Sequence, residues 1–558
     1  MLTAAKKRRT PAEGTGSGAR GASDGAAKKP RPSPTKKRGL EHPWQRVGRF
    51  APRYSLAASA CSPLLTGLGY THENNRIPQG AHCQPGGHPK APGILKPRRT
   101  TICISGPASE HQVGIRATTR SPTDQNDLSP TKSFGQHRNS LFCAGSCLGL
   151  MQRIPPIGTT PHGDIFFTDD ERQKHLVLFG KSGSGKSTVL FNLAMADILA
   201  GQGVIFIDPH GDTAEAIIDA MPPNRVHDVC YFNVADAEYP VGFNPLAGIT
   251  PARRALAASG IVSTFAHLWG DSFGPRLTHF LFNATAALLE SPHTTLLDIS
   301  LMFTDERFRD RVVARVTDPI VGRFWREEYP SYDRNFASEA ASPVLNKVGQ
   351  FAASPIVRNI LGQHTPKFDL QYAMENRQIV IANLSKGHIG ETASNLLGSL
   401  LISHLQLLTM ARAELPAADR VPVYVHVDEA ANFSTDAFAS LLSEARKYRT
   451  HFVLGTQYTS ALRPEVRDAI LGNVGTLMIF RVSAADAEIL APEFHPLPPN
   501  ELVDQWPYRA WLRRIDNNQY PIELAPPAHP PRHALERVIS TSRRKFARHR
   551  DQIERSFQ

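Results

Sequence analysis

The sequence predicts an α/β fold in which a mainly parallel β-sheet is covered by helices. From residue 175 onward, short β-branched or aliphatic runs alternate with longer segments whose apolar residues have helical spacing. This alternation is typical of a parallel sheet with helical crossovers. Seven such runs indicate one substantial α/β domain, with expected strands at His175–Phe179, Val204–Asp208, Val229–Val234, Gln378–Leu384, Val421–Asp428, Phe452–Thr456 and Leu477–Val482.

The segment between the third and fourth expected strands has a different pattern. It lacks a comparable strand run and shows helical periodicity, for example within Leu277–Leu288. We therefore expect an all-α insertion at 250–370, which divides the α/β domain into residues 151–249 and 371–525. After 525, proline-rich pieces lead into a basic, helix-like C-terminal tail over 526–558.

The first 150 residues are rich in Pro, Gly, Ser, Arg and His and show no sustained periodicity. Such a composition buries too little apolar surface to offset the entropy lost when a chain becomes ordered. The first methionine after Met1 is Met151, and strand and helix patterns begin just beyond it. We expect residues 1–150 to be a disordered basic tail or an extension of the gene model upstream of Met151. Cys143 and Cys147 alone would make only half of a zinc site.

Positive charge is concentrated at the two ends of the chain. The 558 residues have a formal net charge of +12, and residues 1–150 contain 23 Lys and Arg against 7 Asp and Glu. Residues 526–558 hold 8 basic and 3 acidic residues, whereas residues 151–525 hold 32 basic and 41 acidic ones. The overall basic charge is therefore no evidence that the central block binds nucleic acid, and motifs have to supply that evidence.

Cysteine usage and hydropathy indicate the compartment. Five of the six cysteines lie in residues 1–150, which does not indicate a disulfide framework and fits a reducing cytoplasm. The longest apolar stretches, such as Leu141–Met151 and Phe280–Leu289, are shorter than the roughly 20 residues that a membrane helix needs. We expect neither a transmembrane segment nor a secretory signal.

A phosphate-binding motif directly follows the first expected strand and precedes a helical pattern at Val189–Leu199. It reads G-K-S-G-S-G-K-S-T and fits G-x-x-x-x-G-K-[ST]. The glycines let backbone N–H groups converge on phosphate oxygens at a helix N-terminus. In such a loop Lys186 reaches the β and γ phosphates, and the Ser187 hydroxyl ligates Mg²⁺. We therefore expect nucleotide to bind at Gly180, Lys181, Ser182, Gly183, Ser184, Gly185, Lys186, Ser187 and Thr188.

Two adjacent carboxylates lie at the end of the strand expected over Val421–Asp428. Asp428 is predicted to hold Mg²⁺, directly or through water, together with Ser187. Glu429 is predicted to orient and deprotonate the attacking water. A base beside the metal carboxylate favours an ATPase over a small-molecule kinase.

Polar groups flank the next expected strand, Phe452–Thr456. Gln457 follows it, at a place where an amide could sense the γ-phosphate, although a glutamine at a strand end often only hydrogen-bonds a loop. Upstream, Arg446 and Arg449 offer guanidinium groups that we expect near the same edge of the sheet, although surface arginines on helices are usually solvated.

In combination these motifs resemble the conjugative DNA-transfer ATPases, the type IV secretion coupling-protein (TraD-like) branch of the HerA/FtsK superfamily of DNA pumps. The resemblance covers about Met151 to Pro526. It rests on residues 174–187, the I-D-P-H-G-D run at 207–212, the V-G-F-N-P-L run at 241–246, Asp428-Glu429, E-A-R-K-Y at 444–448, and Gln457.

The resemblance implies a RecA-like P-loop NTPase domain with an all-α insertion. It also implies a homo-oligomeric ring of six subunits around DNA, with ATP and Mg²⁺ bound between neighbours. Arg446, eleven positions before Gln457, best matches the arginine that acts in trans on a neighbouring site; Arg449 and Arg481 are second choices. Asp208 and Asp212 match an acidic motif of the family, and His210 is interpreted as a turn residue.

We therefore expect an Mg²⁺-dependent ATPase that translocates DNA, in which Glu429, Gln457 and Arg446 act in catalysis. One alternative is a HerA-like DNA-processing translocase, and another is a protein-secretion or pilus motor that does not use DNA. A non-hydrolysing scaffold is disfavoured by the intact Lys186, Asp428 and Glu429. Coupling proteins of membranes carry N-terminal transmembrane helices that we do not find here. We therefore expect a cytoplasmic protein, and docking on a secretion channel at the inner membrane, if it occurs, would need a separate membrane or relaxosome partner.

Overall fold

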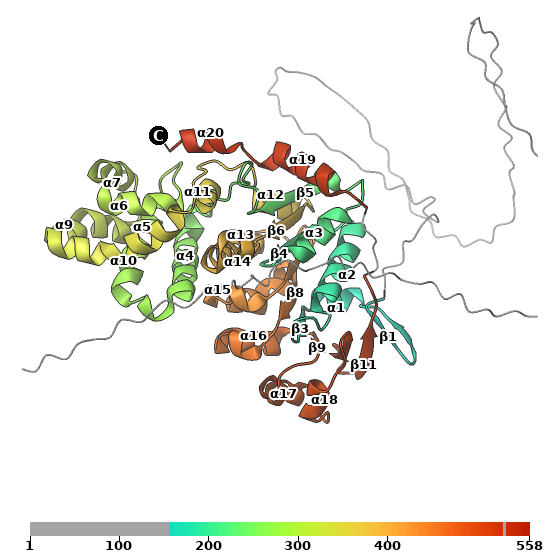
Figure 1. Ribbon diagram of the computed structural model, residues 1–558. Helices are drawn as coiled ribbons and strands as arrows, with labels where there is room; N and C mark the ends of the chain where they lie inside the picture. The colour runs from blue at the N-terminus through green and yellow to red at the C-terminus, as the bar shows by residue number, and fades with distance from the viewer. Residues whose placement is uncertain (1–155, 528–531, 558) are drawn as a thin grey trace, which may run out of the picture. The chain divides into compact units, whose positions relative to one another are not determined.

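The computed structural model describes residues 156–527 and 532–557 (Figure 1). The tail or gene-model extension expected at 1–150 lies outside these residues. All seven expected strands are present and form consecutive parallel neighbours in one sheet, which confirms the predicted α/β class. Their order is β9 (Thr476–Ile479), β3 (Leu176–Phe179), β8 (Thr450–Thr456), β7 (Val423–Val427), β4 (Gly203–Asp208), β6 (Ile379–Asn383) and β5 (Val229–Asn233).

Four strands that the sequence analysis did not find extend the sheet beyond β9 with antiparallel pairing. They follow β9 in the order β10 (Arg509–Arg513), β11 (Gln519–Leu524), β1 (Gly158–Thr160) and β2 (Gly163–Ile165). Their residues are mostly exposed or half-buried, so they lack the continuous apolar runs of the central strands. The hairpin β10–β11 lies next to β9, which in turn lies next to β3.

Successive side chains of the central strands enter two different hydrophobic cores, one on each face of the sheet. Val177 and Phe179 belong to one core, and Leu176 and Leu178 belong to the other. Figure 1 shows the helices of these two layers on opposite sides of the strands. The layer at Leu176 contains α2 (Lys186–Leu199) and α3 (Asp212–Asp219); the opposite layer contains α14 (Glu391–Ala411), α15 (Asp436–Glu444) and α16 (Pro464–Asn473).

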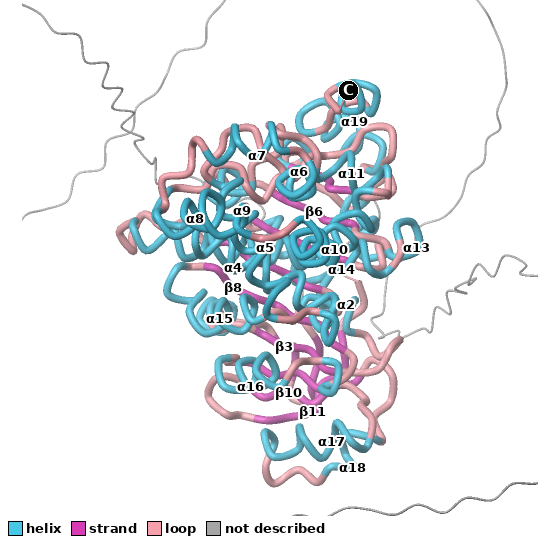
Figure 2. The backbone as a smooth tube through the Cα atoms, turned by 90° about the vertical axis from the view of Figure 1, so that its left-hand side faces the viewer, coloured by secondary structure: helices cyan, strands magenta, loops and turns pink. Residues whose placement is uncertain are grey.

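The backbone between β5 and β6 is described throughout and contains helices and no strand. In Figure 1 the labelled helices α4–α7, α9 and α10 gather on the left, which is the side that faces the viewer in Figure 2. They share the core on the α14 side of the sheet, where α4 and α14 pack together. The boundaries 250–370 of the expected insertion remain a prediction. The helices are α4 (Arg254–Trp269), α5 (Pro275–Leu289), α6 (Ile299–Thr304), α7 (Glu306–Val313), α8 (Pro319–Arg323), α9 (Tyr329–Ser331), α10 (Arg334–Ala352), α11 (Pro355–Leu361) and α12 (Leu370–Glu375).

Helix α14 and its continuation, Glu391–Glu414, form the one helix in the described part of the chain that is long and apolar enough to cross a membrane. No such segment was expected from the sequence. In its most apolar window, 78% of the helix is buried inside the fold. A core helix of a soluble protein passes the same test of length and composition, so this one is weak evidence for a membrane span.

The described part of the expected C-terminal tail folds back onto the sheet. In α19 (Leu535–Phe546), the Ser542 hydroxyl accepts a hydrogen bond from the N–H of Tyr231 in β5 at 2.9 Å. Arg543 donates two hydrogen bonds to Asp236, at 2.7 and 2.9 Å. The remaining helices are α1 (Asp169–Gln173), α13 (Lys386–Ile389), α17 (Ala484–Leu490), α18 (Pro499–Val503) and α20 (Arg550–Arg555).

Candidate functional site

The G-x-x-x-x-G-K-S segment forms a loop between β3 and α2, as its position in the sequence predicts. Gly183 and Gly185 have φ values of +74° and +116°, which side chains with a Cβ rarely adopt. Two main-chain bonds fix the start of the loop to neighbouring strands: Gly180 N donates to Thr456 O at 3.2 Å, and Lys181 N donates to Arg481 O at 2.9 Å. Gly185 is the N-cap of α2, so the helix N-terminus points its unpaired N–H groups at this loop.

The Lys186 side chain is buried beneath the loop. Its Nζ donates to Gly180 O at 2.6 Å and to Lys181 O at 3.2 Å. Burial lowers the pKa of Lys186 below its ordinary value, and the nearby carboxylates of Glu429 and Asp428 oppose that shift. The Lys186 ammonium is largely removed from water and has only uncharged carbonyl oxygens as hydrogen-bond partners. An anionic phosphate would stabilise this positive charge more than the carbonyl oxygens do.

Ser187 and Asp428 come together although 241 positions separate them in the chain. The Ser187 Oγ donates to Asp428 Oδ2 at 3.1 Å. Burial raises the pKa of the Asp428 carboxyl, and the negative charge of Asp208 adds to the shift, whereas the hydrogen bond from Ser187 opposes it. A carboxylate whose charge is costly in this environment is stabilised by a nearby cation.

Glu429 follows Asp428 in a backbone conformation that is uncommon for a residue with a side chain. Its φ and ψ are +51° and +58°, in the left-handed region, where such a residue is strained and where strain often accompanies function. Its N–H donates to Asp428 Oδ1 at 3.0 Å, and its Oε1 accepts from Gln457 N at 3.2 Å. The structure thus brings Glu429 and Gln457 together beside Asp428.

These residues line one cavity of about 370 Å³ at the carboxyl edge of the parallel strands. Two residues of its wall, Thr213 and Tyr508, were not predicted from the sequence to bind a ligand. Tyr508 directly precedes β10, and no sequence pattern pointed to it because the β10–β11 hairpin was not predicted. The lining consists of Ser182, Gly183, Gly185, Lys186, Ser187, Thr188, His210, Asp212, Thr213, Asp428, Glu429, Gln457 and Tyr508.

Asp208, which the resemblance singled out together with Asp212, is fully buried and closes the turn before α3. Its Oδ1 accepts from His210 N at 2.8 Å, and its Oδ2 accepts from Ala214 N at 2.9 Å. Asp212 is exposed and lines the cavity, and so does His210.

The expectation that Arg446 and Arg449 lie near the same edge as Gln457 is wrong. Both arginines precede β8, whereas Gln457 follows it, and the seven residues of this strand span about 20 Å. Arg446 lies near His175 at the opposite, amino edge: burial first, then the charges of His451 and Arg446, lower the pKa of His175 to about 3. Arg446 is exposed and is too remote to act on the cavity of its own chain.

The two other candidate arginines differ in position. Arg449 is exposed at the amino edge, where its Nη1 donates to Arg420 O at 3.2 Å. Arg481 follows β9 at the carboxyl edge and is also exposed, and its carbonyl accepts from the phosphate loop.

The donor set fits Mg²⁺ and a phosphorylated ligand. Magnesium prefers oxygen ligands and usually takes only one or two from the protein, with the remainder from phosphate and water. The Ser187 hydroxyl and the Asp428 carboxylate supply such oxygens side by side. Within residues 156–527 and 532–557, no group of three or more His, Cys, Asp or Glu side chains forms a metal site. The buried Ser184 hydroxyl in the loop lacks a hydrogen-bond partner among these residues.

Comparison with known proteins gives one relative in sequence. The chain is 22% identical over 343 residues to the type 4 coupling protein DotL of Legionella pneumophila, a match that covers 51% of this chain. The match spans 43% of DotL, which is less than half of that protein's length. No family model matches the chain.

Comparison with solved structures gives the bacterial conjugative coupling protein TrwB. Its trigonal form with sulphate has a TM-score of 0.50 and 15% identity, and its complex with the ATP analogue ADPNP has 0.50 and 16%. Each match covers 68% of this chain and 92% of the TrwB chain. At this identity the likeness shows the fold. The sequence match to DotL and the fold shared with TrwB confirm the predicted resemblance to the coupling ATPases of type IV secretion.

Proposed function

We propose that the protein is an ATP-hydrolysing motor that moves DNA, of the kind found among the type IV secretion coupling proteins. The observation that supports this proposal most strongly is the cavity in which Lys186, the Ser187–Asp428 pair and the Glu429–Gln457 pair meet. A phosphate loop, a metal carboxylate and a base in one cavity are the parts that nucleoside triphosphate hydrolysis requires.

In the proposed mechanism, the N–H groups of residues 180–188 and the Lys186 ammonium bind the phosphates. When bound, Mg²⁺ neutralises charge on the phosphate oxygens, and Ser187 and Asp428 would hold it. Glu429 accepts the proton of the attacking water, because its carboxylate lies beside Asp428 and is fixed by the N–H of Gln457. Gln457 follows β8 directly. If its side-chain amide contacts the γ-phosphate, the loss of that phosphate removes the contact, and the resulting movement of Gln457 is passed to β8.

No arginine is among the residues that line this cavity. An arginine that stabilises the transferring phosphoryl group can come from a neighbouring subunit. Arg446 is exposed at the edge opposite to the cavity, so a head-to-tail ring would bring it to the next subunit. We propose a homo-oligomeric ring, six-membered as in the family that the chain resembles, with one nucleotide at each interface.

DNA is the proposed substrate of the motor, with a membrane or relaxosome component of a conjugation system as its partner. The proposal that the motor uses DNA rests on the motifs that resemble conjugative DNA-transfer ATPases and on the fold shared with the conjugative coupling protein TrwB. The charge of residues 151–525 does not support it, because this block is acidic overall. A ring can grip DNA with a few basic residues that line its pore, so this balance is compatible with DNA.

The test measures ATP turnover by the full chain with and without DNA, with Glu429→Gln as the matched blank. We expect DNA to stimulate turnover in the unmodified protein and to leave the blank inactive. A rate of ATP turnover that neither single- nor double-stranded DNA changes would support the protein-secretion or pilus motor instead. Nucleotide binding without any hydrolysis would support the scaffold.

A further inference from the structure

The nucleotide cavity has two chemically different ends, and the strand order fixes which is which. The phosphate loop follows β3, whose neighbours are β8 on one side and β9 on the other. Asp428, Glu429 and Gln457 lie at the ends of β7 and β8, so the terminal phosphate belongs on that side. The nucleoside therefore leaves the loop on the opposite side, toward β9 and the hairpin β10–β11.

Tyr508 lies on this second side and lines the cavity. The Tyr508 residue is 54% exposed, and a Cβ placed on Gly185 would come within 3.3 Å of the Tyr508 Cδ1 atom. The ring therefore borders Gly185, the N-cap of α2. An aromatic face left open to solvent beside a nucleotide loop is the kind of surface on which a base stacks.

Hydrogen bonds to the phosphate loop and to β11 fix the backbone of Tyr508. Its N–H donates to Ser184 O in the phosphate loop at 3.0 Å, and its carbonyl accepts from Leu524 N in β11 at 2.8 Å. Its φ is +62°, in the left-handed region that is uncommon for an aromatic residue, so the backbone is strained at this position. These contacts connect the position of the ring directly to the loop.

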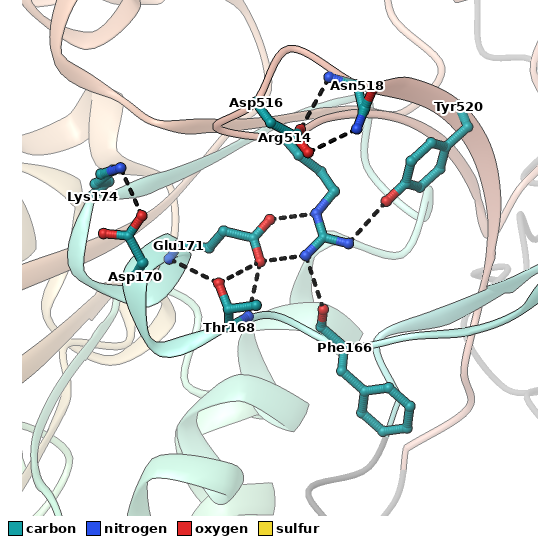
Figure 3. Close-up of polar contacts among 9 residues, drawn as sticks. All are labelled: Phe166, Thr168, Asp170, Glu171, Lys174, Arg514, Asp516, Asn518 and Tyr520. Atoms are coloured by element: carbon teal, nitrogen blue, oxygen red, sulfur yellow. Dashed lines mark hydrogen bonds and ion pairs between the residues drawn. The ribbon is translucent and has the colours of Figure 1, made fainter.

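The far end of the same hairpin is anchored by an ion pair, which Figure 3 shows. Arg514, just after β10, donates from Nε and Nη2 to the two carboxylate oxygens of Glu171, each at 2.5 Å. Glu171 is buried, and it also accepts from the N–H and the hydroxyl of Thr168. The Arg514 Nη1 donates to the Tyr520 hydroxyl at 3.2 Å. Anchored at both ends, the hairpin is a rigid support for Tyr508.

We propose that Tyr508 is the base platform of the site and stacks on the purine of the bound nucleotide. This inference rests on the proposed function, because it requires that nucleoside phosphates bind in the cavity. Stacking involves the face of the base and not the groups at its edge, so it should raise the affinity for adenine and guanine nucleotides alike. The Tyr508 hydroxyl is not required.

The test compares the affinities of ADP, GDP and inorganic tripolyphosphate for the full chain and three variants, and measures the affinity of the unmodified protein for ATP as a reference. Tyr508→Ala removes the ring, and Tyr508→Phe keeps it. Trp506→Ala is the matched control, since Trp506 is 72% exposed, two residues away and absent from the cavity wall. We expect Tyr508→Ala to weaken ADP and GDP binding by about tenfold and to leave tripolyphosphate binding unchanged. Tyr508→Phe and Trp506→Ala should bind all three like the unmodified protein.

A spectroscopic measurement checks the same contact without depending on the alanine variant. The fluorescence of 1,N6-etheno-ADP should be quenched on binding to the unmodified protein and to Tyr508→Phe, because the ring stacks on the modified base.

The inference is overturned if Tyr508→Ala weakens tripolyphosphate as much as ADP, or if it changes neither. It is also overturned if the unmodified protein binds tripolyphosphate as tightly as the triphosphate ATP, while the proposed function then stands. Failure to bind any of the ligands would contradict the proposed function itself.

Discussion

The two edges of the parallel sheet differ in how their charged groups are satisfied. At the carboxyl edge, Lys186 and Asp428 are buried with pKa values displaced by burial, and Glu429 has a strained backbone. At the amino edge, the buried Glu171 is fully paired with Arg514. The first arrangement is costly without a ligand, whereas the second is a finished structural contact. Lys186, Asp428 and Glu429 therefore belong to a ligand-binding site, whereas the Glu171–Arg514 pair stabilises the fold.

Arg446 is the exception at the amino edge. Its side chain is exposed, and it makes no hydrogen bond or ion pair with any residue in 156–527 or 532–557. No arginine is in the lining of the cavity at the carboxyl edge, and the amino edge presents Arg446, whose side chain is without a partner among the described residues. A single subunit is therefore expected to hold two incomplete halves, which become complete only between neighbours.

The largest expected effects lie at the carboxyl edge. Lys186→Ala should abolish nucleotide binding, because the lysine contacts phosphates in the ground state. Glu429→Gln should retain binding and lose hydrolysis, because Glu429 acts on the water alone. Binding assays with labelled ADP and turnover assays on both variants separate the two roles. An active Glu429→Gln protein would remove Glu429 from the role of base.

At the amino edge, Arg446→Ala should lower turnover by a factor of the order of 10³–10⁵ while nucleotide affinity stays close to that of the unmodified protein. Steady-state turnover and ADP affinity are the two measurements. Arg449→Ala is the matched control at the same edge, and we expect it to retain most activity. Equal losses in the two variants would indicate a general disturbance of this surface.

The structural contact at the amino edge should affect stability before activity. Arg514→Ala leaves the Glu171 charge buried without its partner and should lower the free energy of unfolding by about 3 kcal/mol. Lys174→Ala removes the exposed pair with Asp170, also visible in Figure 3, and should cost less than about 1 kcal/mol. Urea denaturation of both variants measures the difference. Similar small losses would mean that the Glu171–Arg514 pair adds nothing beyond a surface contact.

The smallest expected effect comes from the basic N-terminal region. Removing residues 1–150 should leave ATP turnover essentially unchanged, because every residue that lines the cavity lies between Ser182 and Tyr508. Removing residues 532–558 is the contrasting deletion, since Val538 and Phe546 are buried in the cores and their loss should destabilise the fold. Loss of nucleotide binding in the 151–558 fragment would show that the N-terminal region supports the site.

The sequence was most informative where one local pattern determines the outcome. The seven central strands were all predictable, because strands buried on both faces read as continuous apolar runs. Lys186 and Ser187 were predictable from their spacing to the glycines, and Asp428 from its place at a strand end.

What the sequence did not reveal depends on long-range pairing. Strand β10 begins with Arg509 and ends with Arg513, so the apolar run between them is too short to indicate a strand. Its place in the sheet depends on pairing with two other strands, β9 and β11. Tyr508 could not be identified before that hairpin was known. The position of Arg446 was wrongly predicted because closeness in sequence to Gln457 suggested closeness in space, whereas the full length of β8 separates the two residues.

The most direct test of the shared site mixes two inactive proteins, Lys186→Ala and Arg446→Ala. In a head-to-tail ring, some interfaces of the mixture pair an intact phosphate loop with an intact Arg446. We expect each protein alone to be inactive and the mixture to recover part of the ATP turnover of the unmodified protein. If the two proteins demonstrably assemble together and no ratio of them restores turnover, Arg446 does not act on a neighbouring site, and the account of two half-sites is wrong.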